Sequence, residues 1–217
     1  MADQLGDRLA NIARLAAERM TYPAPLALVD PMAAEAEQGR DEWRRNRWST
    51  LVPSRFCMAT LEDIDGDARD TLGEWAARPG ARNLVLAGPV GAGKTHAAVA
   101  AAREVFTLHR FDVTFLPVVE LLDQLRPGGP ADALAELCEV DLLVVDDLGS
   151  ERPTDWTAER MFAVVNRRWL DERPTVVTTN LTGRELEQAV GARTYSRVVG
   201  GAVTVTIRGE DRRKGTR

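Results

Sequence analysis

The sequence predicts an α/β fold in which a parallel sheet is sandwiched between helices. Short apolar runs alternate along the chain with stretches of helical periodicity, which is the element order of a parallel sheet. The runs are apolar at consecutive positions, as in Leu142-Leu143-Val144-Val145, which is typical of strands buried on both faces. Proline and glycine clusters separate the elements, and these residues favour turns.

Two charged helices are expected before this alternation begins. Residues 2–20 place apolar side chains at helical spacing and end at Tyr22-Pro23-Ala24-Pro25, where proline stops a helix. Residues 32–48 form a second helical stretch, and Pro53 closes the region. Because two short helices bury little apolar surface, we expect residues 1–54 to be an arm that binds a partner, with folding back on the main domain as the alternative.

Residues 55–208 are then expected to form the folded domain, and residues 209–217 a basic tail. Thr182 with Glu185 is a capping-box signature for a helix after the fourth strand. The expected strands are residues 83–87, 113–116, 142–145, 175–179 and 203–207, and the other expected helices are residues 95–106, 118–125, 131–137 and 155–170.

Composition narrows the class of protein. The 217 residues carry 28 basic and 33 acidic side chains, so wholesale coating of nucleic acid is not expected. No apolar run has the length of a membrane span, and the first residues lack the pattern of a signal peptide. Two cysteines and two histidines give little material for disulfides, zinc sites or histidine catalysis. We therefore expect a cytoplasmic protein without a membrane partner.

Residues Gly88-Pro89-Val90-Gly91-Ala92-Gly93-Lys94-Thr95 fit the phosphate-binding pattern G-x-x-x-x-G-K-[ST]. Glycines allow backbone N–H groups to turn toward a phosphate, and the following helix directs its N-terminal dipole at the same anion. Lys94 supplies a charge for the β- and γ-phosphates, and the Thr95 hydroxyl is a ligand for Mg²⁺. The predicted strand before and helix after the motif favour this interpretation over a plain glycine-rich turn.

Polar residues end two further predicted strands. Asp146 and Asp147 follow Leu142-Leu143-Val144-Val145, and Asn180 follows Thr175-Val176-Val177-Thr178-Thr179. An acid at the end of a neighbouring strand is placed to hold the Mg²⁺ shell, which we assign to Asp146. Asp147 is then the candidate to polarise the attacking water, and Asn180 to orient that water or bind the γ-phosphate.

The order of these motifs, followed by Tyr195-Ser196-Arg197-Val198, resembles the DnaC/IstB family of AAA+ ATPases over about residues 55–208. Arg55-Phe56 and Gly93-Lys94-Thr95-His96 also fit the family. The resemblance implies a P-loop NTPase fold of the AAA+ or RecA-like kind, with ATP and Mg²⁺ as cofactors. It makes residues 88–95 Walker A, with His96 beside it, and Asp146-Asp147 Walker B. Asn180 becomes sensor I, and Arg197, with Arg193 as second candidate, becomes an arginine finger that acts in a neighbouring subunit.

Two departures from the family pattern accompany the resemblance. Asp147 stands where the usual catalytic glutamate is one methylene longer, so slow turnover is expected. After Ile207 we expect no helical lid domain. In loaders of this family the interval that corresponds to residues 116–137 contacts single-stranded DNA, but here it offers Arg126, few other cations and no aromatic residue.

The resemblance implies an ATP-dependent loader of the replicative helicase, of the DnaB family, that self-associates and binds single-stranded DNA. An IstB-like transposition helper is the first alternative. The second is a nucleotide-gated adaptor that hydrolyses little ATP because Asp147 is short. A small-molecule kinase is disfavoured because it leaves Asn180 and Tyr195-Ser196-Arg197 unexplained.

Overall fold

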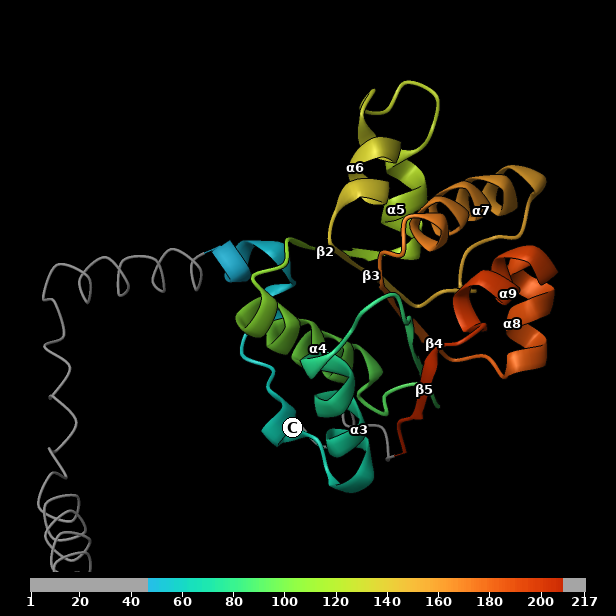
Figure 1. Cartoon of the computed structure of the whole chain (residues 1–217). Helices are drawn as coiled ribbons and strands as arrows, with labels where there is room; N and C mark the ends of the chain where they lie inside the picture. Colours follow the sequence, from blue (N-terminus) through green and yellow to red (C-terminus); the bar gives the residue numbers. More distant parts are fainter. Residues whose placement is uncertain (1–46, 209–217) are drawn as a thin grey trace, which may run out of the picture. The chain divides into compact units, whose positions relative to one another are not determined.

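The computed structural model describes residues 47–208, and these contain a five-stranded parallel sheet in the order β2-β3-β4-β1-β5 (Figure 1). The predicted α/β fold is therefore confirmed. The expected helix at residues 2–20, nearly all of that at residues 32–48, and the basic tail at 209–217 lie outside the described residues. The strands are β1 (Leu84–Ala87), β2 (Val113–Pro117), β3 (Leu142–Asp146), β4 (Thr175–Thr179) and β5 (Val203–Thr206).

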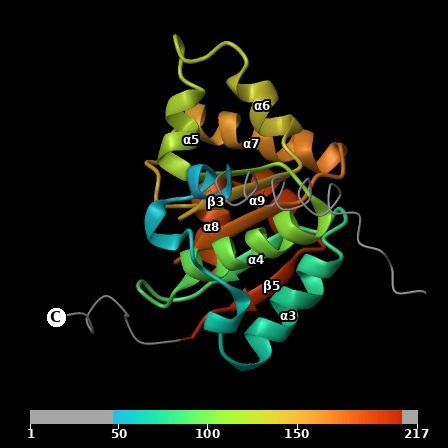
Figure 2. The same ribbon diagram turned by 90° about the vertical axis from the view of Figure 1, so that its left-hand side faces the viewer.

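Helices cover both faces of the sheet (Figures 1 and 2). One apolar cluster joins the sheet to α3 and α4, and a second cluster joins it to α5, α6, α7, α8 and α9. The helices are α3 (Gly66–Ala77), α4 (Lys94–His109), α5 (Val118–Gln124), α6 (Ala133–Glu139), α7 (Asp155–Leu170), α8 (Gly183–Val190) and α9 (Ala192–Val199), with short 3-10 turns η1 (Ser54–Phe56) and η2 (Leu61–Asp63).

Burial on both faces holds for the central strands and not for the last one. Every residue of β3 and β4 is buried. In β5, which forms one edge of the sheet, Thr204 and Thr206 are exposed while Val205 between them is buried. Its alternation of threonine and valine is the pattern of a strand with one covered face, so the expectation of strands apolar on both faces is wrong for β5.

Residues just before the predicted domain boundary pack into its core. Trp48 is 4% exposed, and its ring centroid lies 5.4 Å from that of Phe106 on α4. The Trp48 indole N–H donates a hydrogen bond of 3.2 Å to the Cys57 carbonyl. By compactness the chain divides between Arg45 and Asn46. A deletion that removes the arm and spares the core should therefore end at Arg45.

A buried arginine joins the segments that lead into β3 and β4, at the amino ends of these strands. Arg168 on α7 is 1% exposed, and its guanidinium donates to the carbonyl oxygens of Val140 and Pro174, both at 2.7 Å, and of Leu137 at 3.0 Å. Burial lowers its pKa to about 10. Since each acceptor belongs to a segment that enters or leaves the sheet, Arg168 holds α6, β3 and β4 in register.

Candidate functional site

The loop between β1 and α4 has a backbone that side chains larger than hydrogen would disturb. Gly91 and Gly93 have φ of 81° and 98°, in the left-handed region that glycine adopts without strain. A Cβ on Gly88 would lie 2.3 Å from the Ile207 carbonyl oxygen after β5. The loop therefore passes directly over the neighbouring strand and ends at the N-terminus of a 16-residue helix. This geometry suits a phosphate, because a helix N-terminus presents free N–H groups and a positive dipole.

Lys94 lies across this loop. Its side chain is enclosed, with the residue 5% exposed, and Nζ donates to the Pro89 carbonyl oxygen at 2.8 Å. Nζ also donates to the amide oxygen of Asn180, which follows β4. Because β4 pairs with both β1 and β3, its carboxyl end lies between the loop and the two aspartates. The sequence prediction that Lys94, Asn180 and the aspartates share one edge of the sheet therefore agrees with the geometry.

Asp146, at the end of β3, accepts hydrogen bonds from two hydroxyls. Thr95 Oγ1 lies 3.0 Å from Oδ1 and 3.2 Å from Oδ2, and Thr178 Oγ1 donates to Oδ1 at 2.6 Å. Burial raises the pKa of Asp146 and the charge of Asp147 raises it further, while the hydroxyls and Lys94 oppose that rise. The carboxylate is thus held in place by donors, as a metal ligand must be.

Thr178 is a site residue that sequence reasoning did not single out. It is fully buried in β4, and besides donating to Asp146 its oxygen accepts a hydrogen bond of 2.9 Å from the Asp147 backbone N–H. One hydroxyl therefore fixes both acids. The sequence carried one signal for this role. Two consecutive threonines, Thr178 and Thr179, follow two valines at the end of the predicted strand.

Asp147 is turned toward the cleft by its backbone. Its φ of 56° is in the left-handed region, which aspartate tolerates better than most residues. Asn180 Nδ2 donates to Asp147 Oδ1 at 3.3 Å, so the amide bridges the Lys94 ammonium and this carboxylate. The three side chains form one chain of hydrogen bonds at the floor of the cleft.

A cleft of about 240 Å³ opens over these residues. His96 lines it, with Nε2 3.1 Å from Asp63 Oδ2 and its ring edge-on to Phe56 at a centroid distance of 6.5 Å. Phe56 and Arg55 were noted in the sequence only as features of the family, and they form one wall. The lining residues are Arg55, Phe56, Val90, Gly91, Gly93, Lys94, Thr95, His96, Asp147 and Asn180.

The donor set fits a Mg²⁺ ion that is shared with a nucleotide. Among residues 47–208 there is no cluster of three or more His, Cys, Asp or Glu side chains able to hold a metal alone. Thr95 Oγ1 and the Asp146 carboxylate supply adjacent hard oxygen donors, of which Thr95 lines the cleft and Asp146 lies buried behind it. Mg²⁺ in phosphate-transfer sites is typically held by one or two carboxylates together with substrate phosphates, which is what this set provides.

The two arginine candidates do not line this cleft. Arg193 is exposed at the start of α9. Arg197 lies near the opposite edge of the sheet, because its carbonyl accepts a hydrogen bond of 2.9 Å from Asn83, the residue just before β1. The four residues of β1, spanning about 13 Å, separate Asn83 from the phosphate-binding loop. Within one subunit, therefore, neither arginine lies in the cleft that contains Lys94.

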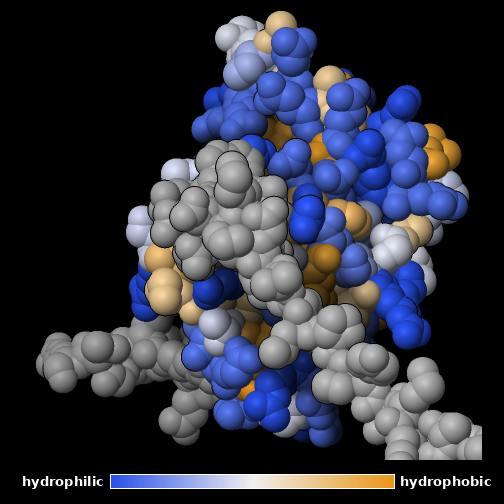
Figure 3. All heavy atoms as spheres, turned by 60° about the vertical axis from the view of Figure 1, so that its left-hand side comes forward, coloured by the Kyte–Doolittle hydropathy of each residue, from blue (hydrophilic) through white to orange (hydrophobic). Residues whose placement is uncertain are grey.

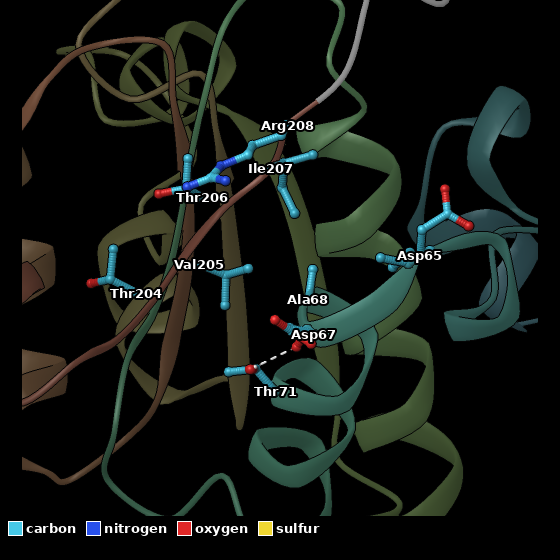
Figure 4. Close-up of a pocket in the computed structure, with 10 residues that line it drawn as sticks. Asp65, Asp67, Ala68, Thr71, Thr204, Val205, Thr206, Ile207 and Arg208 are labelled. Carbon is cyan, nitrogen blue, oxygen red and sulfur yellow. Dashed lines mark hydrogen bonds between the residues drawn. The ribbon is translucent and has the colours of Figure 1, made fainter.

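A separate hollow of about 500 Å³ lies between α3 and β5 (Figure 4). Asp67, Thr71 and Val205 are among its lining residues, and Thr71 Oγ1 donates to the Asp67 carbonyl oxygen at 2.8 Å within α3. None of the phosphate-binding loop lines it. Its lining reaches the carboxyl end of β5 at Ile207 but shares no residue with the lining of the cleft over Lys94.

We expect Asp146→Asn to raise the thermal stability of the nucleotide-free protein, and to do so more at pH 7 than at pH 4. Because the folded pKa of Asp146 lies above the ordinary value of 3.8, the folded state binds its proton more tightly than the unfolded chain does. The wild type therefore loses stability as pH rises from 3.8 through the folded pKa, and asparagine removes this loss. Thermal unfolding of both proteins at the two pH values measures it.

The exposed Asp70 of α3 gives the control variant, Asp70→Asn. The same change in Tm for Asp146→Asn at both pH values, or a lower Tm at pH 7, would contradict the interpretation of Asp146 as a buried charge.

The described residues include no helix that is both long enough and apolar enough to cross a bilayer. On the face drawn in Figure 3, hydrophilic residues predominate, and hydrophobic residues are visible as separate patches between them.

Comparison with known proteins agrees with the geometry. The family model described as "IstB-like ATP binding protein" matches residues 31–217. XkdC, a protein of the phage-like element PBSX of Bacillus subtilis, is 33% identical over 123 residues, which are 52% of this chain and 46% of that protein. The replicative helicase loader DnaC of Escherichia coli is 29% identical over 122 residues, 54% of this chain and 49% of DnaC. A protein of insertion sequence IS5376 from Geobacillus stearothermophilus is 27% identical over 113 residues, 50% of this chain and 44% of that protein.

The chain spans about half the length of these curated relatives. Among solved structures, DnaI superposes with a TM-score of 0.66 and 24% identity, covering 76% of this chain and 99% of that one. The DnaC helicase loader superposes with a TM-score of 0.64 and 22% identity, covering 72% of this chain and all of that one. These likenesses establish the P-loop NTPase fold.

Proposed function

The chain belongs to the IstB-like family of ATP-binding proteins, and we propose that it is an ATP-dependent loader of the replicative DNA helicase. The observation that carries the ATP-dependent part is the meeting of Lys94, Thr95, Asp146 and Asn180 at one edge of the sheet. The similarity to the helicase loader DnaC, at 29% identity, supports the choice of helicase as the partner.

In this proposal the chain's own residues bind and orient the nucleotide. Backbone N–H groups of the loop at residues 88–95, except that of Pro89, which has none, would bind the phosphates. Lys94 would neutralise their charge, and Thr95 with Asp146 would hold Mg²⁺. The bound metal supplies charge stabilisation for the transferred phosphoryl group. Asp147 accepts a proton from the attacking water, and Asn180 fixes the direction of the Asp147 carboxylate.

Hydrolysis is proposed to require a second copy of the chain. Arg197 and Arg193 lie outside the cleft of their own subunit, so we propose that one of them acts on the nucleotide of a neighbouring subunit. This dependence would couple hydrolysis to self-association. Arg197 is the first candidate because its side chain is held in a defined direction, while Arg193 is exposed.

Single-stranded DNA is the proposed nucleic-acid partner. A further hollow, beside α5, is the proposed binding site for it. This hollow, of about 520 Å³, lies beside α5 and includes Arg126 and Leu122. The segment after β3 adds Arg152 and Trp156 to the same hollow. The aromatic ring and second cation that the interval 116–137 lacks therefore come from another part of the chain. Arginines around an apolar surface with a tryptophan suit a stacked base and its phosphate, although the Glu151 carboxylate also lines the hollow.

A transposition helper is the alternative that a specific observation favours. The matching family model is IstB-like, and the IS5376 protein is 27% identical. Such a protein would use the same nucleotide site and bind duplex DNA and a transposase. The partner, rather than the ATP site, separates the two functions. If the chain binds ATP and its turnover is near zero, the function is instead that of a nucleotide-gated adaptor.

We expect the replicative helicase of the source organism to co-purify with the full chain in the presence of ATP, and not with a chain lacking residues 1–45. The proposed arm is otherwise untested, because residues 1–46 lie outside the described part of the chain. The deletion spares Trp48, which belongs to the core. Circular dichroism of the shortened chain controls for its folding.

Binding that is lost with the arm supports the loader and assigns the arm its role. Absence of binding by the full chain with ATP would contradict the loader and favour the transposition helper. Retention by the shortened chain would move the helicase contact to residues 46–217.

A further inference from the structure

Arg197 is held at both of its ends. Its guanidinium carbon lies 3.9 Å from the centroid of the Trp169 ring, and Nε donates to Asn166 Oδ1 at 3.2 Å. Its backbone carbonyl accepts from Asn83 Nδ2 at 2.9 Å, and the next residue, Val198, is buried. The guanidinium is therefore held from two directions, by the face of the Trp169 ring and by the Asn166 side chain.

The partner ring is unusual among the tryptophans in the described part of the chain. Trp48 and Trp75 are 4% and 1% exposed and Trp156 is partly buried, whereas Trp169 is 45% exposed and is followed by Leu170, which is 60% exposed. Unlike the other three tryptophans of residues 47–208, Trp169 neither belongs to nor packs against the two apolar clusters, so core packing does not account for its position. The face of its ring lies against the Arg197 guanidinium.

We propose that Trp169 is a positioning residue that orients Arg197 for the nucleotide cleft of a second copy of the chain, with Asn166 as its helper. This inference rests on the proposed action of Arg197 in the neighbouring subunit. A free arginine side chain loses several rotamers when it enters a site, and an arginine already held at the surface loses fewer. Trp169 does not touch the nucleotide and acts only through the direction of the guanidinium.

The test is the steady-state ATPase activity of Trp169→Ala at protein concentrations that saturate self-association. We expect kcat to fall about 5-fold, the scale of a partly exposed cation–π contact, with KM for ATP unchanged. Trp169→Phe keeps an aromatic face and should recover most of the activity. Leu170→Ala removes the neighbouring exposed apolar side chain without touching the stack, and should behave as wild type.

A double-mutant comparison separates positioning from a structural role. If Trp169 acts through Arg197, Trp169→Ala has no further effect on turnover in an Arg197→Ala background, measured with enzyme in excess over ATP. An equal loss in both backgrounds, or wild-type activity of Trp169→Ala when Arg197→Ala is impaired, overturns this inference alone. Wild-type activity of Arg197→Ala overturns the role of Arg197 itself, and the role of Trp169 with it. Thermal unfolding of each variant reports any general loss of stability.

Discussion

Replacement of Lys94 by alanine is expected to abolish measurable ATP binding, with a loss of affinity of about 100-fold, the scale of a charged hydrogen bond of about 3 kcal/mol. Lys94 is the cation of the phosphate-binding loop, and its ammonium is already directed by Pro89 and Asn180. Because the residue is only 5% exposed, the charge acts in a site where water screens it little. Isothermal titration with ATP and Mg²⁺ measures the effect.

The chain offers a natural control, because Lys214 is the only other lysine. Lys214→Ala should bind ATP as wild type does. Lys94→Met, which keeps the aliphatic stem, separates loss of charge from loss of packing. ATP affinity within a few-fold of wild type for both Lys94 variants would contradict the assignment of the loop as the nucleotide site.

Arg197→Ala is expected to retain ATP binding and to lose hydrolysis, with kcat reduced on the order of 10³-fold, as for other arginine fingers. The residue is remote from the cleft of its own subunit, so the Kd for ATP should not change. A cation supplied by a neighbour acts only on charge that develops during the reaction, and its removal therefore appears in kcat. Phosphate release at saturating ATP, together with nucleotide titration, measures both quantities.

Arg193→Ala is the matched variant, because Arg193 lies on the same helix, α9, and is exposed. A loss of hydrolysis in Arg193→Ala and not in Arg197→Ala would transfer the role to Arg193. Wild-type turnover of both variants would contradict any arginine finger on α9.

Much of the fold could be predicted because its central strands are apolar without interruption. The strand predicted at residues 175–179 coincides with β4, and those predicted at 83–87 and 142–145 lie within one residue of β1 and β3 at each end. The capping pair of Thr182 and Glu185 correctly marked the start of α8. These signals are local, so a single sequence carries them.

Helices α3 and α9 were not predicted, for two different reasons. Helix α3 contains Gly66 and Gly73, which lower its intrinsic preference, and it is stabilised by burial of Leu72 and Trp75. Helix α9 begins directly after Gly191, one residue beyond α8, so the two read as one element in the sequence.

The sequence predicted which residues of the site lie at the ends of strands. It did not predict the hydrogen bonds that connect them. Lys94, Asp146, Asp147 and Asn180 each close or follow an apolar run, which identifies one edge of a parallel sheet. The bond from Thr178 to Asp146 depends on β4 lying beside β3, an order the sequence does not state. The stacking of Arg197 on Trp169 likewise joins two helices that are far apart in the chain.

The central claim is that a nucleotide bound at Lys94 is hydrolysed with a cation from another copy of the chain, and mixing two inactive variants tests it most directly. Lys94→Ala lacks the nucleotide site and keeps Arg197, whereas Arg197→Ala keeps the site and lacks the finger. We expect each to be inactive alone and the mixture to recover hydrolysis, since Lys94→Ala subunits supply Arg197 to neighbours that hold ATP. A mixture no more active than the sum of its parts, together with wild-type subunits that also fail to activate Arg197→Ala, would contradict the claim.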